Sequence, residues 1–306
     1  MSTPLPSGSP ATRHTLPLAA VLWLVGLTLA WGLGWPLMKY AVSELPLYTF
    51  RIVTAWGGGL LVLALSALQG NSIALPRAEW RPAILSALFN ITGWFYFTAL
   101  GLTLLPAGRA VVLAYTMPLF AILAARLMLK EPITGRKTVG LVLGAGAVLL
   151  LLGQSVHRLG DAPAGVLAVV AAAASWGIGT VFQKRVWRTP VLTLVGWQLL
   201  LGGIPLGILA ALHDTAPFAH LTLYGLLAVT YVIVIATLFG FWAWFSILTL
   251  APASVASIAI LPVPLVGVLS SALVLGEPIG WHELLALALI TAALATVLPL
   301  PRFGRH

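Results

Sequence analysis

Three residues with hydrogen-bonding or aromatic side chains, Asn90, Trp94 and Thr98, follow one another at spacing four inside an otherwise apolar stretch. Residues four apart lie on one face of a helix, so an amide, an indole and a hydroxyl would project together. None of these groups carries a charge, and a buried amide needs a hydrogen-bonding partner. The pattern predicts a neutral surface that could hydrogen bond to a small polar molecule and stack on it.

Residues of the same chemical kinds occur in the other apolar stretches. Tyr115, which lies just before Pro118, is a further candidate for binding a substrate. Six other candidates are Trp31, Trp176, Gln183, Thr237, Trp244 and Ser257. Other roles stay open for them. Hydroxyl groups in apolar helices commonly bond to their own backbone carbonyls. Tryptophans beside glycines, as at Trp31 and Trp176, can instead serve close packing between helices.

Four prolines interrupt these stretches: Pro36, Pro118, Pro262 and Pro264. Proline has no N–H and breaks the hydrogen-bond ladder of a helix, which frees backbone groups close to the candidate residues. We predict that these positions are hinges, and a static kink is the alternative.

Ionisable residues are few and lie elsewhere. All Asp, Glu and His residues fall in predicted loops or at predicted helix ends. A carboxylate within an apolar helix is the usual proton carrier of a membrane pump, so we predict that no buried carboxylate carries protons here. We expect no catalytic residue, metal site or cofactor, because cysteine is absent, no Walker loop is present and no serine has a histidine nearby to activate it.

The apolar stretches dominate the chain. Of its 306 residues, 60% are hydrophobic and only 8% are charged, and the mean hydropathy is +1.04. Soluble domains have about a quarter charged residues, so this composition excludes a soluble enzyme and a nucleic-acid-binding protein. It predicts an all-α membrane protein, because about 20 apolar residues cross a bilayer as a helix. Breaks of Pro, Gly or charge predict ten transmembrane helices: Leu16–Val42, Leu47–Leu68, Arg81–Leu104, Ala107–Leu129, Thr138–Gly153, Ala164–Val186, Leu192–Leu212, Leu221–Leu250, Ala253–Leu275 and Glu283–Leu300.

The basic residues predict the orientation of these spans. If the N-terminus is inside, the 16 Lys and Arg residues fall in cytoplasmic segments with four exceptions: Lys39, Arg51, Arg109 and Arg158. Cytoplasmic loops of membrane proteins are enriched in basic residues. We therefore predict a multi-pass protein of the bacterial inner membrane whose tails, residues 1–15 and 301–306, are both cytoplasmic. Long lysine side chains at helix ends, Lys39 and Lys184, are expected to reach the lipid headgroups.

The chain also contains an internal repeat. With a shift of 146 residues, Leu102–Thr134 matches Leu248–Gly280 at 14 of 33 positions, and Glu131-Pro132 meets Glu277-Pro278. Chance agreement in a Leu/Ala-rich chain would be about a tenth, so the match indicates a duplication.

A second block extends the repeat to the first helix of each copy. With a shift of 145 residues, Trp31-Gly32 meets Trp176-Gly177. We predict two five-helix repeats, residues 16–155 and 163–300. Because five is odd, the second repeat would enter the membrane inverted, and inverted repeats are typical of transporters that use alternating access.

These features together resemble the drug/metabolite transporter superfamily, and within it the EamA-type exporters. The resemblance rests on the duplicated five-helix unit, the Trp-Gly motif in the first helix of each half and the Glu-Pro that ends the fourth. Among that group the chain is similar to the bacterial amino-acid exporters. The resemblance implies a central cavity lined by the first, third and fourth helices of each half, and efflux of amino acids, related metabolites or drugs.

We therefore expect a transporter that exports small metabolites, amino acids including apolar and aromatic ones, through a central uncharged cavity. Its expected partners are that small molecule and the lipid bilayer, with no nucleic acid and no ATPase, and the chain is expected to act as a monomer. Two alternatives stay open: an exporter of lipophilic drugs or nucleobases, and a membrane interaction or sensor protein without a transport cycle.

Overall fold

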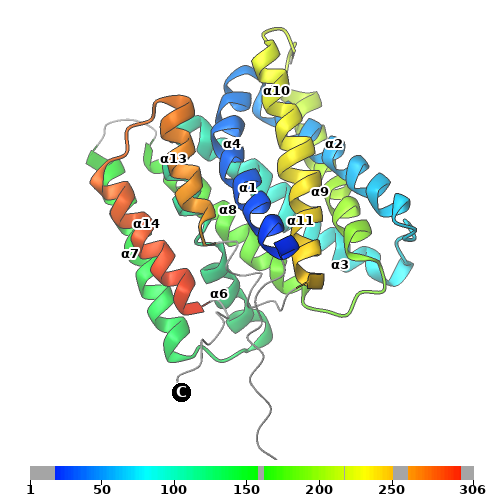
Figure 1. The fold of residues 1–306 in the computed structure, drawn as a ribbon, viewed down its shortest axis with the longest axis horizontal. Helices are drawn as coiled ribbons and strands as arrows, with labels where there is room; N and C mark the ends of the chain where they lie inside the picture. Colours follow the sequence, from blue (N-terminus) through cyan, green and yellow to red (C-terminus); the bar gives the residue numbers. More distant parts are fainter. Residues whose placement is uncertain (1–17, 158–161, 217, 251–260, 298–306) are drawn as a thin grey trace, which may run out of the picture.

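The computed structural model describes residues 18–157, 162–216, 218–250 and 261–297, and within these ranges every regular element is a helix (Figure 1). In chain order the helices are α1 (Leu18–Glu44), α2 (Leu47–Leu68), α3 (Arg77–Ala87), η1 (Leu88–Gly93), α4 (Trp94–Leu104), α5 (Ala107–Ala114), α6 (Met117–Leu129), α7 (Gly135–His157), α8 (Ala162–Gln183), α9 (Val191–His213), α10 (Leu223–Tyr231), η2 (Val232–Phe239), α11 (Gly240–Leu250), α13 (Val263–Leu275) and α14 (Trp281–Val297).

Among the described residues, eight helical segments are long and apolar enough to cross a membrane, and α13 and α14 are shorter apolar helices. The outer surface is apolar as well, since the side chains of Leu68, Leu127 and Leu273 are 86%, 81% and 86% exposed. Such a surface suits contact with lipid chains. The expectation of an all-helical membrane protein is therefore confirmed.

The helix bounds agree with the predicted spans to within a few residues. The largest differences within the described part are four residues, at α7, which ends at His157 and not at Gly153, and at α3, which begins at Arg77 and not at Arg81. Arg77 and Glu79 form its polar first turn, which a search for apolar runs leaves out. The start of the predicted ninth span, at Ala253, lies outside the described residues.

Two of the long segments have π-helical turns in their middle, η1 between α3 and α4, and η2 between α10 and α11. The backbone N–H of Trp94 donates to the carbonyl of Phe89, and that of Gly240 donates to the carbonyl of Ile235. A shift of 146 residues maps one hydrogen bond onto the other. The π-turn is thus a property of both repeats, and π-turns in helices frequently mark functional sites.

The segment that contains α5 and α6 is broken. The helix is interrupted at Tyr115 and Thr116, directly before Pro118 at the start of α6. Proline cannot donate the hydrogen bond that would continue the helix from Ala114. The break leaves irregular backbone in the interior, where Tyr115 is only 4% exposed.

Helices of the N-terminal half, residues 18–157, pack against helices of the C-terminal half, residues 162–297, throughout the molecule. α2 lies along α9, α7 along α14, α1 against α11 and α13, and α8 against α4 and α6 (Figure 1). Glycines permit the close approach of α2 and α9: a Cβ atom on Gly196 would lie 2.6 Å from Leu63 Cγ.

Carboxylates connect the loops of one half to helix starts of the other. Glu79 accepts hydrogen bonds from the backbone N–H of Arg188 at 2.7 Å and of Thr189 at 3.2 Å. Glu44 likewise accepts from the backbone N–H of Thr222 at 2.9 Å. These acidic residues lie at helix ends, as expected. Glu44 satisfies a backbone donor at the start of α10, and Glu79 satisfies two donors of the loop that precedes α9.

Candidate functional site

Trp94 and Trp176, two of the predicted site residues, form an aromatic pair between the halves. Their ring centroids are 5.2 Å apart with an edge-to-face angle of 61°. Trp94 opens α4 directly after η1, and Trp176 lies in α8. Edge-to-face geometry is the favoured arrangement of two aromatic rings. The sequence pattern did not pair these residues, which are 82 positions apart (176 − 94).

Trp31 of α1 and Trp244 of α11 form a second aromatic pair between the halves. Their ring centroids are 6.2 Å apart. Here the first helix belongs to the N-terminal half and the π-interrupted helix to the C-terminal half. Trp31 Nε1 also donates a hydrogen bond of 3.0 Å to the carbonyl of Ala236 in η2. Each pair therefore joins the first helix of one half, α1 or α8, to the π-interrupted helix of the other half.

Asn90 lies in η1 and is 2% exposed. Its Oδ1 has no hydrogen-bond partner in the described ranges, and a Cβ atom on Gly179 of α8 would lie only 1.3 Å from it. Asn90 and Trp94 thus both face α8. The predicted face exists, but the structure packs it against a neighbouring helix.

Thr98, the third residue of that face, makes two kinds of hydrogen bond. Its hydroxyl donates to the carbonyl of Trp94 at 2.6 Å, in the manner typical of threonine in apolar helices. It also accepts a hydrogen bond of 2.8 Å from Nη2 of Arg51. Arg51 lies in α2 and is 2% exposed. We placed Arg51 at an outer helix end, and it does lie near the start of α2, but its guanidinium turns inward between α2 and α4. The uncharged lining stays a prediction.

Lys39 and Lys184, which we expected to reach the lipid headgroups, both have partners within the protein. Lys39 Nζ donates to the carbonyls of Leu102 and Leu105, the latter at 3.0 Å, and so caps the C-terminal end of α4. Lys184 forms an ion pair of 2.7 Å with Glu131. The hydrogen bond from Lys184 holds the pKa of the Glu131 carboxyl below its usual value.

Two of the remaining polar candidates, Thr237 and Gln183, hydrogen bond within the protein. Thr237 donates to its own helix at the Val232 carbonyl, at 2.8 Å, and Gln183 donates to Gln198 Oε1 at 3.1 Å. Tyr115 lies at the break between α5 and α6. Ser257 lies outside the described residues.

The predicted hinge prolines lie at four points of the helices. Pro36 is inside α1 and buried, and Pro118 follows the break before α6. Pro262 caps the N-terminus of α13, and Pro264 lies in its first turn. The helix interruption at Pro118 is visible, whereas hinge motion at these positions stays a prediction.

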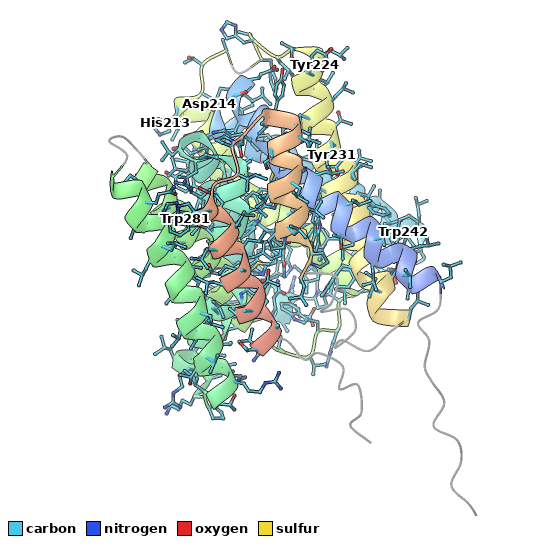
Figure 2. The ribbon with its side chains drawn as sticks, turned by 60° about the vertical axis from the view of Figure 1, so that its left-hand side comes forward. His213, Asp214, Tyr224, Tyr231, Trp242 and Trp281 are labelled. Atoms are coloured by element: carbon cyan, nitrogen blue, oxygen red, sulfur yellow. The ribbon has the colours of Figure 1, made fainter. Side chains whose placement is uncertain are left out.

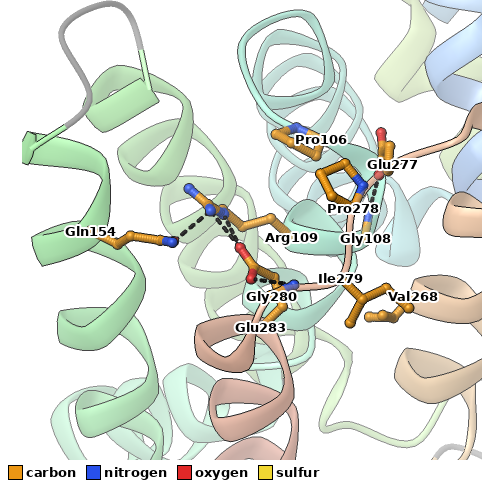
Figure 3. A pocket seen from close by; sticks show the side chains of 10 residues that line it. All are labelled: Pro106, Gly108, Arg109, Gln154, Val268, Glu277, Pro278, Ile279, Gly280 and Glu283. Atoms are coloured by element: carbon orange, nitrogen blue, oxygen red, sulfur yellow. Dashed lines mark hydrogen bonds and ion pairs between the residues drawn. The ribbon is translucent and has the colours of Figure 1, made fainter.

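A small pocket of about 100 Å³ lies at one end of α5 and α14 (Figure 3). Arg109 of α5 forms a buried ion pair with Glu283 of α14 and also donates to Gln154 Oε1. Glu277 accepts from the N–H groups of Ala107 at 2.7 Å and Gly108 at 2.9 Å. The pocket is smaller than the about 300–1,000 Å³ of typical ligand sites, and none of the predicted site residues lines it.

Sequence reasoning missed this polar cluster. Glu277-Pro278 was interpreted as a helix stop, and Arg109 was counted only as a loop cation. The sequence did contain one signal for this cluster: the charged Arg109 follows the repeated LTLxPA motif at Leu102–Ala107. Within the described ranges, no group of three or more His, Asp or Glu residues could hold a metal ion.

Comparisons with known proteins agree on the class of this chain. The model of the EamA-like transporter family matches residues 18–153 and 163–298. Two Bacillus subtilis proteins, "Uncharacterized transporter YoaV" and "Uncharacterized transporter YvbV", are 27% and 30% identical and cover 90% and 94% of this chain and 92% of their own length.

A Salmonella typhimurium protein named "Probable amino-acid metabolite efflux pump" is 26% identical over 86% of this chain and 89% of its own. A solved crystal structure covers 91% of this chain and 96% of its own with a TM-score of 0.65 at 21% identity, which shows a shared fold.

Proposed function

Because this chain belongs to the EamA-like transporter family, we propose that it exports small metabolites, amino acids foremost, by alternating access between its two halves. The cargo includes apolar and aromatic amino acids, whose side chains suit the tryptophan-rich surfaces where the halves meet. A relative named as a probable amino-acid metabolite efflux pump supports this choice.

The observation that carries the proposal is the pairing of Trp31 with Trp244 and of Trp94 with Trp176. Both pairs lie where the first helix of one half meets the π-interrupted helix of the other. Irregular backbone at membrane depth occurs where it is buried in protein or lines a cavity. We assign the substrate to this region and propose Asn90, Thr98, Tyr115, Gln183 and Thr237 as further binding residues, together with Ser257, which lies outside the described residues.

Alternating access requires that the two halves be related as inverted repeats, ten spans in all. The matching π-turns support this relation. So do the carboxylate contacts: Glu79 in the first turn of α3 binds the loop at Thr189, and Glu44 at the end of α1 binds Thr222 at the start of α10. A shift of about 145 residues exchanges the two contacts, and rocking of one half against the other would open each end in turn.

Location and coupling complete the proposal. The bias of the basic residues supports an inner-membrane protein with both termini in the cytoplasm, and a relative is named as an inner membrane transporter.

The chain acts as a monomer without an ATPase, because one chain contains both halves. Transport is facilitated diffusion or exchange, since the described acidic residues lie at helix ends or in loops. Strong dependence on an imposed pH gradient, lost on neutralising one carboxylate, would overturn this coupling.

Counterflow in proteoliposomes tests the function. Purified protein is loaded with one amino acid and offered a panel of labelled amino acids outside, with protein-free liposomes as the baseline. Accumulation of a subset of the panel supports amino-acid transport. No accumulation of any amino acid, with uptake of a nucleobase or a lipophilic cation, would assign the chain to those cargoes; no flux of any compound would favour a sensor.

Two variants then test the site. Trp94→Ala and Asn90→Ala should abolish transport or change the ranking of substrates, and Trp242→Ala, at the exposed surface of α11 (Figure 2), is the control. Wild-type rates and ranking in both site variants would remove these two residues from the substrate site.

A further inference from the structure

Arg51 is a buried cation on the interface between α1, α2 and α4. It lies four residues after the start of α2 at Leu47, so it is about 6 Å along the helix axis, within the span. Its guanidinium is enclosed by apolar and weakly polar groups: the ring of Phe50 at 4.7 Å, the ring of Phe95 at 5.1 Å and the Met38 sulfur at 3.6 Å. Charged side chains in such positions are costly and usually functional.

The hydrogen bonds of Arg51 are incomplete. A guanidinium has five N–H donors in a planar fork. One donates to the Thr98 hydroxyl at 2.8 Å and one to the Met38 thioether. Nε is buried and has no hydrogen-bond partner among the residues that the structure describes. Since a buried donor without a partner costs free energy, the residue is poised to bind an acceptor that the described part of the protein does not supply.

Arg51 also has no counter-ion within the described part of the chain. The ion pairs found among the described residues are Arg109 with Glu283 and Lys184 with Glu131. The buried Arg109 thus has a carboxylate partner, and the part-buried Lys39 has a carbonyl partner at Leu105. A buried charge needs a paired charge of opposite sign, and for Arg51 the described structure offers only a hydroxyl, a sulfur and two aromatic faces.

We propose that Arg51 binds the carboxylate of the transported substrate, which makes a carboxylate group the feature that this transporter selects. The guanidinium fork matches the two oxygens of a carboxylate, and the phenyl rings of Phe50 and Phe95 would face the apolar part of the same molecule. Lys39 adds positive charge nearby, because it binds α4 one to two turns beyond Thr98. This inference rests on the proposed transport function and narrows its substrate class.

The test compares two substrates that differ at the carboxylate alone. Labelled phenylalanine and phenylalaninamide are offered to proteoliposomes in counterflow, and the ratio of their initial rates is measured. The wild type should prefer the carboxylate by about tenfold or more, as expected for loss of one charge-assisted hydrogen-bonded pair. In Arg51→Gln this ratio should fall close to one, and in Arg51→Lys, which keeps the charge but not the fork, it should fall part of the way.

Controls separate a folding defect from a binding defect. Arg81→Gln, which removes an exposed arginine of α3, should keep the wild-type ratio. If the Arg51 variants do not fold, the wild type itself decides the question: phenylalanine should raise its thermal unfolding temperature in detergent and phenylalaninamide should not. Equal stabilisation by the two compounds, or an unchanged ratio in folded Arg51→Gln, would overturn the role of Arg51.

The outcomes also distinguish this inference from the proposed function. A wild type that transports phenylalanine and its amide equally well leaves amino-acid export standing and overturns the carboxylate site. A wild type that transports phenylpropionate, a carboxylate without the amino group, in an Arg51-dependent way supports the site and widens the cargo to carboxylates generally. A wild type that transports none of the three compounds but carries a nucleobase overturns both.

Discussion

The indole nitrogen of Trp31 donates a 3.0 Å hydrogen bond to the carbonyl of Ala236, 205 residues further along the chain. In a regular helix this carbonyl would accept from the N–H of Gly240, but in η2 that N–H donates to Ile235 and Thr237. Trp31 therefore replaces the hydrogen bond that the π-turn removes. One side chain of the N-terminal half completes the backbone of the C-terminal half, which ties the π-turn to the packing of α1.

Trp31→Phe should destabilise the protein by about 1 kcal/mol, because it keeps an aromatic ring but leaves the Ala236 carbonyl without its donor. The unfolding temperature in detergent measures the effect. Trp242→Phe is the matched control, since Trp242 is 40% exposed (Figure 2) and lies in α11, the helix that continues from η2 and Ala236. Equal unfolding temperatures for both variants would mean that water or lipid headgroups replace the donor.

Gly179→Ala should strongly impair folding, because its Cβ would lie 1.3 Å from Asn90 Oδ1 and 3.0 Å from the Asn90 backbone nitrogen. The double variant Gly179→Ala with Asn90→Ala should recover part of the loss, since it removes the first of these contacts. Yield of monodisperse protein on size exclusion measures both. Gly153→Ala, where a Cβ meets nothing within 4 Å, should behave as the wild type does. Equal losses in the single and double variants would show that the Asn90 amide is not the obstacle.

Glu79→Ala should cost about 2–3 kcal/mol of stability. Glu79 is 3% exposed and accepts from two backbone N–H groups, those of Arg188 and Thr189. The substitution leaves both without this partner, and the N–H of Thr189 is buried. Chemical unfolding in detergent gives the value. Glu131→Ala, which removes a carboxylate from an exposed ion pair, should cost much less; a similar cost for the two would contradict the role of burial.

The ion pair of Lys184 with Glu131 should make a small part of the stability dependent on acid pH. The folded pKa of Glu131 is lowered by the Lys184 hydrogen bond. Its contribution is therefore fully present above the ordinary carboxyl pKa of about 4.5 and disappears as the pH falls through the lower folded value. The fall in unfolding temperature between about pH 6 and pH 3.5 should be smaller in Glu131→Gln than in the wild type, and high salt should reduce this difference.

Much of the architecture could be predicted from the sequence because hydropathy and spacing act locally. An apolar run of about 20 residues has no stable place except a membrane-spanning helix, and the repeated Glu131-Pro132 and Glu277-Pro278 mark helix ends without reference to the rest of the chain. The common face of Asn90 and Trp94 follows in the same way from helical periodicity. These features needed no knowledge of which helices are neighbours.

Tertiary structure decided what those faces meet. Asn90 and Trp94 pack on α8, Trp31 reaches η2 and Arg51 turns inward onto Thr98, although each partner is between 47 and 205 residues away. In lipid the hydrophobic effect does not select among apolar helix faces, so close packing at small residues and the pairing of polar groups choose the neighbours. The choice of neighbours depends on all helices at once. For this reason the sequence placed Arg51 near a helix end but could not show that its side chain is buried.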